Sequence, residues 1–354
     1  MRDLDDPGLL ALDREGMLGH ISSLGHELWA AWQQSEELTA PAGSDNVTAV
    51  VLAGMGGSAT AGDYVAAIAA RSSEIPVTVC RGYSLPNYVS ERTLVIVSSY
   101  SGDTEEALSL YDDAWKRGAP LLCITHGGQL AGRAAADGVP IYRIAYESAP
   151  RAAMAHGLAP LLRVCAGLGL LPLDGDDVRG AGAAHARLTS SDLAPSNPVS
   201  RNGAKQAAQL LFGRIPFVFG SDHLASVALR FRNQLAENGK VLGAAEVVPE
   251  SAHNLVVGLT TGETARDSLA VVTIESRETC DPRSVRQMDG QCEQFQECGI
   301  PVWRIDLGAR PLLEQFLLGT AWGDYTSYYL ALLNGVDPTP IPQIERLKAP
   351  PVAL

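Results

Sequence analysis

Short, almost unbroken apolar runs that alternate with helical patterns constrain the fold of this chain most strongly. In the first half these runs read AVVLAG, VTVC, LVIVSS, LLCIT and IYRI, at residues 49–54, 77–80, 94–99, 121–125 and 141–144. Continuous apolar runs of this length are typical of parallel strands that are buried on both faces. Because helical patterns separate most of them, the sequence predicts an α/β fold with helices on both faces of a parallel sheet.

The same order of elements recurs in the second half. Apolar runs at residues 215–219, 269–274 and 300–305 predict three further strands, and a helical pattern covers residues 223–237. The run that starts at 215 follows the run at 49 by 166 residues, and the run at 269 follows that at 94 by 175 residues. A repeat of this kind indicates two similar subdomains, each a parallel sheet flanked by helices.

The expected organisation has five parts. They are an N-terminal helix in residues 1–45, a first subdomain in residues 46–170, a connector in residues 171–200, a second subdomain in residues 201–334 and a C-terminal tail in residues 335–354. The connector is assigned from its composition, since LPLDGDD, GAGAA and APSNP are rich in turn-forming and small residues.

Charge and composition exclude several classes of function. The chain has 27 Lys and Arg against 40 Asp and Glu, a net charge of −13, which is the wrong sign for neutralising a nucleic-acid backbone. The acidic start, MRDLDDPG, lacks the basic flank and apolar core of a signal peptide. No window reaches the roughly 18 apolar residues of a membrane-spanning helix. We therefore expect a cytoplasmic protein without nucleic-acid or membrane partners.

Cysteines and histidines give no indication of a metal or a disulfide framework. The six cysteines form no CxxC pair, and the seven histidines are scattered. Zinc sites and disulfide scaffolds require characteristic spacings of these residues. We expect neither a metal nor any other cofactor.

A glycine-rich turn, GMGGSATAGD at Gly54–Asp63, directly follows the first predicted strand and opens a helix. Glycines permit close backbone approach, and a helix N-terminus offers N–H groups to an anion. A dinucleotide site and a purely structural turn are the alternatives. The dinucleotide fingerprint GxGxxG requires glycine at Ala59, and the chain has no GxxxxGK[ST] motif.

A second loop, SYSGDTEE, follows the predicted strand LVIVSS and also opens a helix. Ser99, Ser101 and Thr104 can converge on one small anion beside the helix N–H groups. That arrangement suits a phosphate monoester. In the alternative interpretation, one hydroxyl caps the helix while Glu105 and Glu106 complement its dipole.

Together with four further segments, these loops resemble the bifunctional phosphoglucose/phosphomannose isomerases, which contain two sugar isomerase (SIS) domains. The four segments are PRAA at 150–153, LAENGKV at 235–241, PESAHN at 249–254 and GVDPTPIPQIERLK at 335–348. The six segments run in order along nearly the whole chain. The resemblance implies two SIS-type subdomains that enclose a sugar phosphate, and a homodimer with shared active sites.

The resemblance also implies a metal-independent aldose-ketose isomerase. Its reaction interconverts glucose 6-phosphate and mannose 6-phosphate with fructose 6-phosphate through an enediolate. By the same resemblance, the residues that bind the substrate phosphate are Gly57, Ser58, Ser99, Ser101 and Thr104.

Four catalytic roles follow from the resemblance. Glu237 is the base that moves the proton, Arg151 stabilises the enediolate, and Lys348 assists ring opening together with His253 from the partner chain. Taken singly, each residue has a simpler interpretation as a surface or chain-end charge. Glu237 precedes Gly239, the expected helix terminator, and a glutamate there works against the helix dipole.

Two competing functions remain at this stage. One is a SIS-type phosphosugar sensor without turnover, although sensors of that kind usually carry a basic helix-turn-helix and this N-terminus is acidic. The other is aminosugar-phosphate chemistry, for which an amidotransferase unit is absent from the sequence. PESAHN also departs from the family pattern, because Ser251-Ala252 replaces a larger apolar residue and asparagine.

Overall fold

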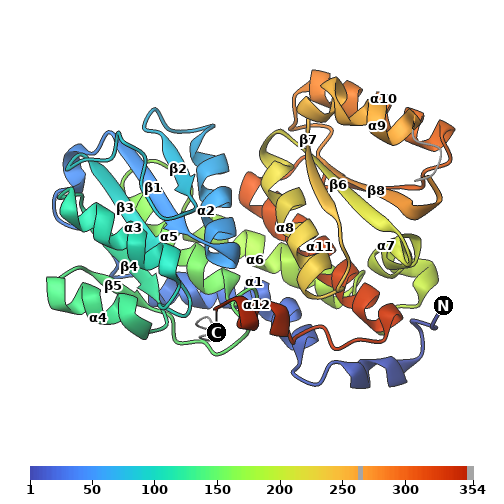
Figure 1. The fold of residues 1–354 in the computed structure, drawn as a ribbon, viewed down its shortest axis with the longest axis horizontal. Coiled ribbons are helices and arrows are strands. Elements are labelled where there is room, and N and C mark those ends of the chain that lie inside the picture. Colours follow the sequence, from blue (N-terminus) through green and yellow to red (C-terminus); the bar gives the residue numbers. More distant parts are fainter. Residues whose placement is uncertain (262–265, 349–354) are drawn as a thin grey trace, which may run out of the picture. The chain divides into compact units, whose positions relative to one another are not determined.

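The computed structural model describes residues 1–261 and 266–348 (Figure 1). The chain divides into two compact units. Unit 1 consists of Met1–Ile21, Leu188–Ala309 and Gly319–Leu354, and unit 2 consists of Ser22–Arg187 and Arg310–Leu318. The unit boundaries fall inside or at the ends of three helices, α1 (Met17–Gln34), α6 (Gly175–Ser190) and α11 (Leu312–Asn334).

Unit 1 contains a four-stranded parallel sheet in the order β7-β6-β8-β9. Its strands are β6 (Ile215–Ser221), β7 (Ala244–Val248), β8 (Leu269–Glu275) and β9 (Val302–Asp306). The three strands expected from apolar runs are present within two residues at each end. The sequence pattern does not predict β7, because Glu246 interrupts its apolar residues.

The helices of unit 1 cover both faces of this sheet. These are α8 (Ala225–Glu237) on one face and α9 (Leu255–Thr261) and α10 (Pro282–Glu297) on the other; unit 1 also contains α7 (Gly203–Leu211) and α12 (Pro342–Lys348). Phe219 of β6 packs with Met288 of α10 in one buried cluster. On the other face α8 approaches α11 closely, because a Cβ on Gly323 of α11 would lie only 3.0 Å from the ring of Phe231.

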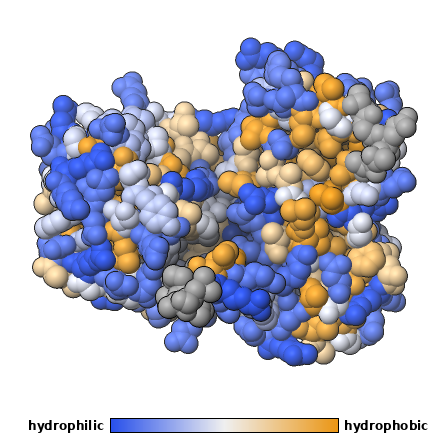
Figure 2. Space-filling view, in the orientation of Figure 1, coloured by the Kyte–Doolittle hydropathy of each residue, from blue (hydrophilic) through white to orange (hydrophobic). Residues whose placement is uncertain are grey.

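Strand β7 forms an edge of its sheet, and apolar side chains near it reach solvent. Hydrophobic residues gather over β6 and β7 on the face drawn in Figure 2. Leu242, Val247 and Val257 are exposed in this part of the chain. Among the described helices, none has both the length and the apolar character to cross a membrane.

Unit 2 contains a five-stranded parallel sheet in the order β2-β1-β3-β4-β5. Its strands are β1 (Ala49–Gly54), β2 (Val77–Cys80), β3 (Thr93–Ser98), β4 (Leu121–Thr125) and β5 (Ile141–Arg143). All five predicted strands are present within one residue at each end. The fold expected from the sequence, two parallel sheets flanked by helices, is confirmed.

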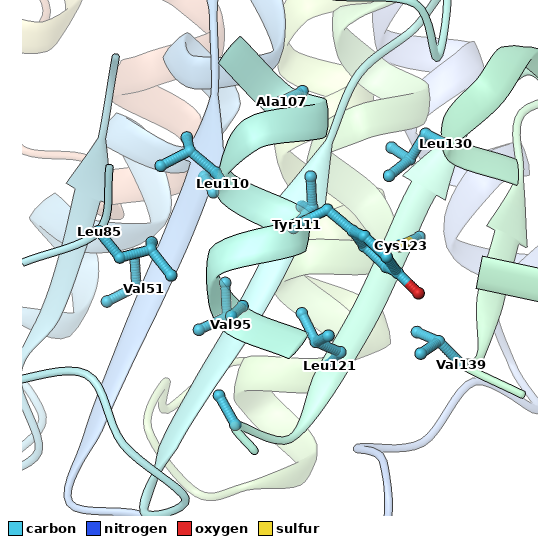
Figure 3. Packing of buried hydrophobic residues seen from close by; sticks show 14 of the residues in the cluster. Val51, Leu85, Val95, Ala107, Leu110, Tyr111, Leu121, Cys123, Leu130 and Val139 are labelled. Carbon is cyan, nitrogen blue, oxygen red and sulfur yellow. The ribbon is translucent and has the colours of Figure 1, made fainter. Parts of the chain in front are cut away.

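Side chains of the central strands of unit 2 alternate between two helical layers. The helices are α2 (Gly56–Ala69), α3 (Glu105–Lys116), α4 (Gly128–Asp137) and α5 (Met154–Gly167). Val51 of β1 belongs to the core beneath α3, where Figure 3 shows Leu110 and Tyr111 over the strands. The next residue, Leu52, lies against Gly62 of α2, as the two-residue period of a strand requires.

Candidate active site

The carboxyl ends of β1 and β3 mark the place in the sheet of unit 2 where the connections diverge. Strand β1 leads into α2 on one face, and β3 leads into α3 on the other. Ligands of open parallel sheets bind at such switch points, because the two loops separate there and leave a crevice. Gly54 pairs with Ser98, so the glycine-rich turn and the SYSGDT loop begin side by side.

Within the SYSGDT loop, the three hydroxyls expected to bind phosphate come together. Ser99 Oγ donates to Thr104 Oγ1 at 3.0 Å, and Ser101 Oγ lies 3.5 Å from the same oxygen. Ser99 Oγ also accepts a hydrogen bond from Gly102 N at 3.1 Å. The loop therefore presents a fixed cluster of hydroxyls at the end of β3.

The arrangement favours anion binding over simple helix capping. Thr104 has the N-cap position of α3, but within the described residues its side chain makes no capping bond to that helix. At the start of α2 the N-cap residue is Met55, whose side chain has no oxygen to offer. Both helix starts thus keep N–H groups directed at the switch point, where an anion can accept from them.

A third loop, between β4 and α4, supports the SYSGDT loop from beneath. Gly102 has φ +74°, and a Cβ there would overlap the carbonyl group of Gly127 and lie 2.9 Å from Thr125 Oγ1. Gly128 has φ +66°, and a Cβ on it would overlap the carbonyl oxygen of Ser101. The sequence signal for this loop is the glycine pair Gly127-Gly128, which follows the strand after one residue, His126.

The GGS turn is packed against the PRAA segment. A Cβ on Gly57 would lie 3.2 Å from the carbonyl oxygen of Pro150 and 3.3 Å from Arg151 Cα. Ser58 follows Gly57 in the first turn of α2 and is half-buried. Arg151 is buried, with 3% of its surface exposed. Unit 2 therefore brings Arg151 beside the turn that carries two of the expected phosphate ligands.

A partly buried polar cluster anchors the chain just before this segment. Tyr146 Oη donates to Glu27 Oε1 of α1 at 2.6 Å, and the Tyr146 ring stacks on His156 of α5 with centroids 4.5 Å apart. Burial lowers the pKa of His156, while burial and then the bond to Glu27 raise the pKa of Tyr146. At neutral pH both rings are uncharged, which suits an anchoring role.

In unit 1, Glu237 is the last residue of α8 and is half-buried. The helix end is closed by a bond from Val241 N to Leu235 O at 3.0 Å. Lys240, with φ +56°, takes the left-handed position that glycine usually occupies at helix ends. Gly239 does not take that left-handed position. Glycine is needed there because a Cβ would lie 2.8 Å from the Leu235 carbonyl oxygen, which is too close.

The C-terminal tail lies beside this helix end. Lys240 Nζ donates to the carbonyl oxygens of Pro338 at 3.0 Å and Pro340 at 2.7 Å, and also to that of Glu237. These bonds hold the chain around Thr339 next to the end of α8. Lys240 thus joins the tail to the backbone at the end of α8, whose last residue, Glu237, is the expected base.

His253 is exposed at the end of a 3-10 turn, η5 (Glu250–His253). Ser251, where the sequence departs from the family pattern, is buried and donates to Gln291 Oε1 at 3.1 Å. Asn254 Nδ2 donates to Glu250 Oε1 at 2.8 Å, so that carboxylate pairs within the turn. The small serine therefore contributes a polar tie to α10 that an apolar residue cannot make.

The expected site residues fall into two sets. Unit 2 holds the phosphate ligands and Arg151, whereas Glu237, His253 and Lys348 belong to unit 1. Lys348 ends α12, and its side chain lies outside the described part of the chain. In the part that is described, no group of three His, Cys, Asp or Glu side chains is arranged to hold a metal ion.

The corresponding switch point of unit 1 is filled by the chain itself. Asp222 follows β6 with φ +52°. Its carboxylate accepts from Asp281 N at 2.6 Å and from Ser284 Oγ at 3.1 Å, at the start of α10. An internal carboxylate thus takes donors that an external anion would need. The two repeats share their strand order but differ at this edge of the sheet.

Comparisons with known proteins agree with this architecture. Residues 46–139 match the SIS domain family, and residues 200–350 match the bacterial phospho-glucose isomerase C-terminal SIS domain. Two solved structures from Thermus thermophilus share the fold. One is a hypothetical protein with a TM-score of 0.70 and 18% identity, covering 96% of this chain and 91% of that one. The other is a glucose-6-phosphate isomerase like protein with a TM-score of 0.62 and 20% identity, covering 98% and 99%.

Two relatives carry the name bifunctional phosphoglucose/phosphomannose isomerase. The protein from Caldicellulosiruptor bescii is 32% identical over 334 residues, which cover 94% of this chain and 98% of the relative. The protein from Aquifex aeolicus is 29% identical over 300 residues, which cover 84% of this chain and 89% of the relative. The chain therefore belongs to the bifunctional phosphoglucose/phosphomannose isomerase family.

Proposed function

We propose that this chain interconverts glucose 6-phosphate and mannose 6-phosphate with fructose 6-phosphate through an enediolate. The observation that carries the proposal is the cluster of Ser99, Ser101 and Thr104 hydroxyls between two helix N-termini at the β1/β3 switch point. Neutral donors and helix dipoles can bind a phosphate monoester without a metal. Membership of the family supplies the substrate class.

The proposed mechanism has three tasks: ring opening, proton transfer between carbons 1 and 2, and stabilisation of the enediolate oxygen. His253 and Lys348 assist ring opening, and Glu237 carries the proton between the two carbons. Arg151 faces the developing negative charge. Because Arg151 is buried, water screens its charge less than at the surface, which strengthens its attraction for an oxyanion.

A coupled assay with fructose 6-phosphate tests this function. We expect formation of both glucose 6-phosphate and mannose 6-phosphate, at a rate that EDTA leaves unchanged, because the proposed mechanism uses only side chains. Sugar-phosphate binding without turnover would instead support a phosphosugar sensor. Loss of activity in EDTA and its recovery with zinc would contradict the metal-free mechanism.

We further propose a cytoplasmic homodimer. The exposed apolar residues Leu242, Val247 and Val257 near the edge strand β7 offer a surface that a second copy can cover. All six cysteines lie among the described residues and are free thiols, as in proteins of reducing compartments.

Mixing two inactive variants tests whether the dimer shares its sites. If His253 serves the partner's site, Glu237→Gln chains mixed with His253→Ala chains should recover about a quarter of wild-type activity. The reason is that half of randomly formed dimers are heterodimers, each with one intact site of two. Each variant alone is the control. Absence of recovery, with subunit exchange verified by mass spectrometry, would mean that each chain uses its own His253.

A further inference from the structure

Tyr100, between Ser99 and Ser101 of the hydroxyl cluster, links this loop to another part of unit 2. Its hydroxyl donates to the carbonyl oxygen of Tyr146 at 2.7 Å and accepts from Ser148 N at 3.0 Å. A phenol that bonds both an acceptor and a donor of one short segment fixes that segment in position and in direction. Residues 146–148 are therefore tied to the loop that presents the expected phosphate ligands.

The rest of Tyr100 is held independently of its hydroxyl. Its carbonyl oxygen accepts from His126 N at 3.0 Å, and its ring stacks on the His126 ring with centroids 5.6 Å apart. His126 Nδ1 lies 2.9 Å from the carbonyl oxygen of Ile144. Removing only the Tyr100 hydroxyl should therefore leave the SYSGDT loop in place and loosen residues 146–148, which keep the side-chain contacts of Tyr146 with Glu27 and His156.

That segment leads directly to Arg151, three residues after Ser148. The chain between them lies against the GGS turn, where a Cβ on Gly57 would lie 3.2 Å from the Pro150 oxygen. The position of Arg151 is thus set from two sides, by the turn and by the Tyr100 hydroxyl. We propose that Tyr100 is a positioning residue for the isomerase reaction, which holds Arg151 in register with the bound phosphate.

The proposal rests on the proposed function, in which Arg151 stabilises the enediolate. The substrate phosphate and the enediolate oxygen belong to one molecule, so the spacing between their two protein partners must match it. A displacement of a catalytic group by about 1 Å can cost 10²-fold in rate. Through its hydroxyl, Tyr100 connects the loop of the expected phosphate ligands with the segment that precedes Arg151.

Tyr100→Phe is the direct test, because it removes one oxygen and keeps the ring. We expect kcat for fructose 6-phosphate to fall by roughly 10- to 100-fold, with KM nearly unchanged because the phosphate ligands remain in place. Tyr142→Phe is the matched control, since Tyr142 is a buried tyrosine of β5 whose hydroxyl bonds Ala31 O at 3.4 Å. It should leave kcat close to that of the wild type.

A double-mutant cycle distinguishes positioning from a general structural role. A lysine ammonium is a point charge on a flexible stem and depends less on orientation than a guanidinium. In an Arg151→Lys background, Tyr100→Phe should therefore lower kcat much less than it does in the wild type. Fully additive effects, or wild-type kcat in Tyr100→Phe, would overturn the proposal.

Hydrogen exchange provides a readout that does not depend on activity. The backbone amides of residues 146–152 should exchange faster in Tyr100→Phe than in the wild type or in Tyr142→Phe. Unchanged exchange rates at these amides would refute the claim that the Tyr100 hydroxyl holds this segment. That result would not depend on whether the protein is an isomerase. A wild-type protein without isomerase activity would count against the proposed function alone.

Discussion

Glu237→Gln should abolish isomerisation while sugar-phosphate binding stays nearly intact. Glutamine keeps the shape and the hydrogen-bonding reach of glutamate, but it cannot accept a proton from carbon. Loss of general-base catalysis typically costs ~10²–10⁴-fold in rate. The measurement is kcat with fructose 6-phosphate, together with calorimetric titration of the same ligand. Phosphate affinity should persist, because its expected ligands lie on other elements.

The free energy of unfolding should not fall together with the activity of this variant. Glu237 ends α8, and a negative charge at a helix C-terminus is unfavourable by about 0.3–1 kcal/mol. Its removal should leave the free energy of unfolding unchanged or slightly higher. Glu297→Gln is the matched control, because Glu297 is exposed and ends α10 in the same unit. It should share the effect on stability without loss of turnover. Wild-type turnover in Glu237→Gln would refute the assignment of the base.

Gly102→Ala should destroy the phosphate site. The backbone at Gly102 has φ +74°, and the added methyl group would overlap the backbone of Gly127. Backbone atoms cannot rotate away as a side chain can, so the SYSGDT loop must move and separate its hydroxyls. Each lost hydrogen bond to a charged group costs about 1.5–3 kcal/mol, or about 10- to 100-fold in affinity. Calorimetric titration with fructose 6-phosphate measures the loss.

Gly118→Ala separates this overlap from ordinary backbone strain. Gly118 has φ +67°, and a Cβ there would meet nothing within 4 Å. Both variants bear the cost of a non-glycine residue in the left-handed region, about 1–2 kcal/mol. Only Gly102→Ala also makes the new methyl group overlap the Gly127 carbonyl beneath the expected phosphate site. Equal affinities of the two variants for fructose 6-phosphate would show that the loop geometry does not control binding.

Local patterns predicted the parts of the molecule that depend on local physics. Strands β1 and β4 coincide with their apolar runs, because a parallel strand covered on both faces needs apolar residues throughout. Edge strand β7 was not predicted, because Glu246 interrupts its apolar residues; the positions before Val248 are half-buried or exposed, and partial burial raises the pKa of the Glu246 carboxyl. An apolar run was a sufficient signal even for the half-buried edge strand β2, whereas β7 has no such run.

Sequence alone determined the alternating strand and helix pattern, the repeat, and the placement of Ser99, Ser101 and Thr104 where a strand ends and a helix begins. These features depend on neighbours in the chain. Tertiary structure decided which loops meet those hydroxyls. Pairing of β3 with β4 brings Gly127 against Gly102, and the Tyr100 hydroxyl reaches a segment 46 residues further along. It also decided that Asp222 fills the second switch point, a contact across 59 residues to Asp281. Strand order and loop packing set such distances, because they arise from burial and hydrogen bonding between elements far apart in the sequence.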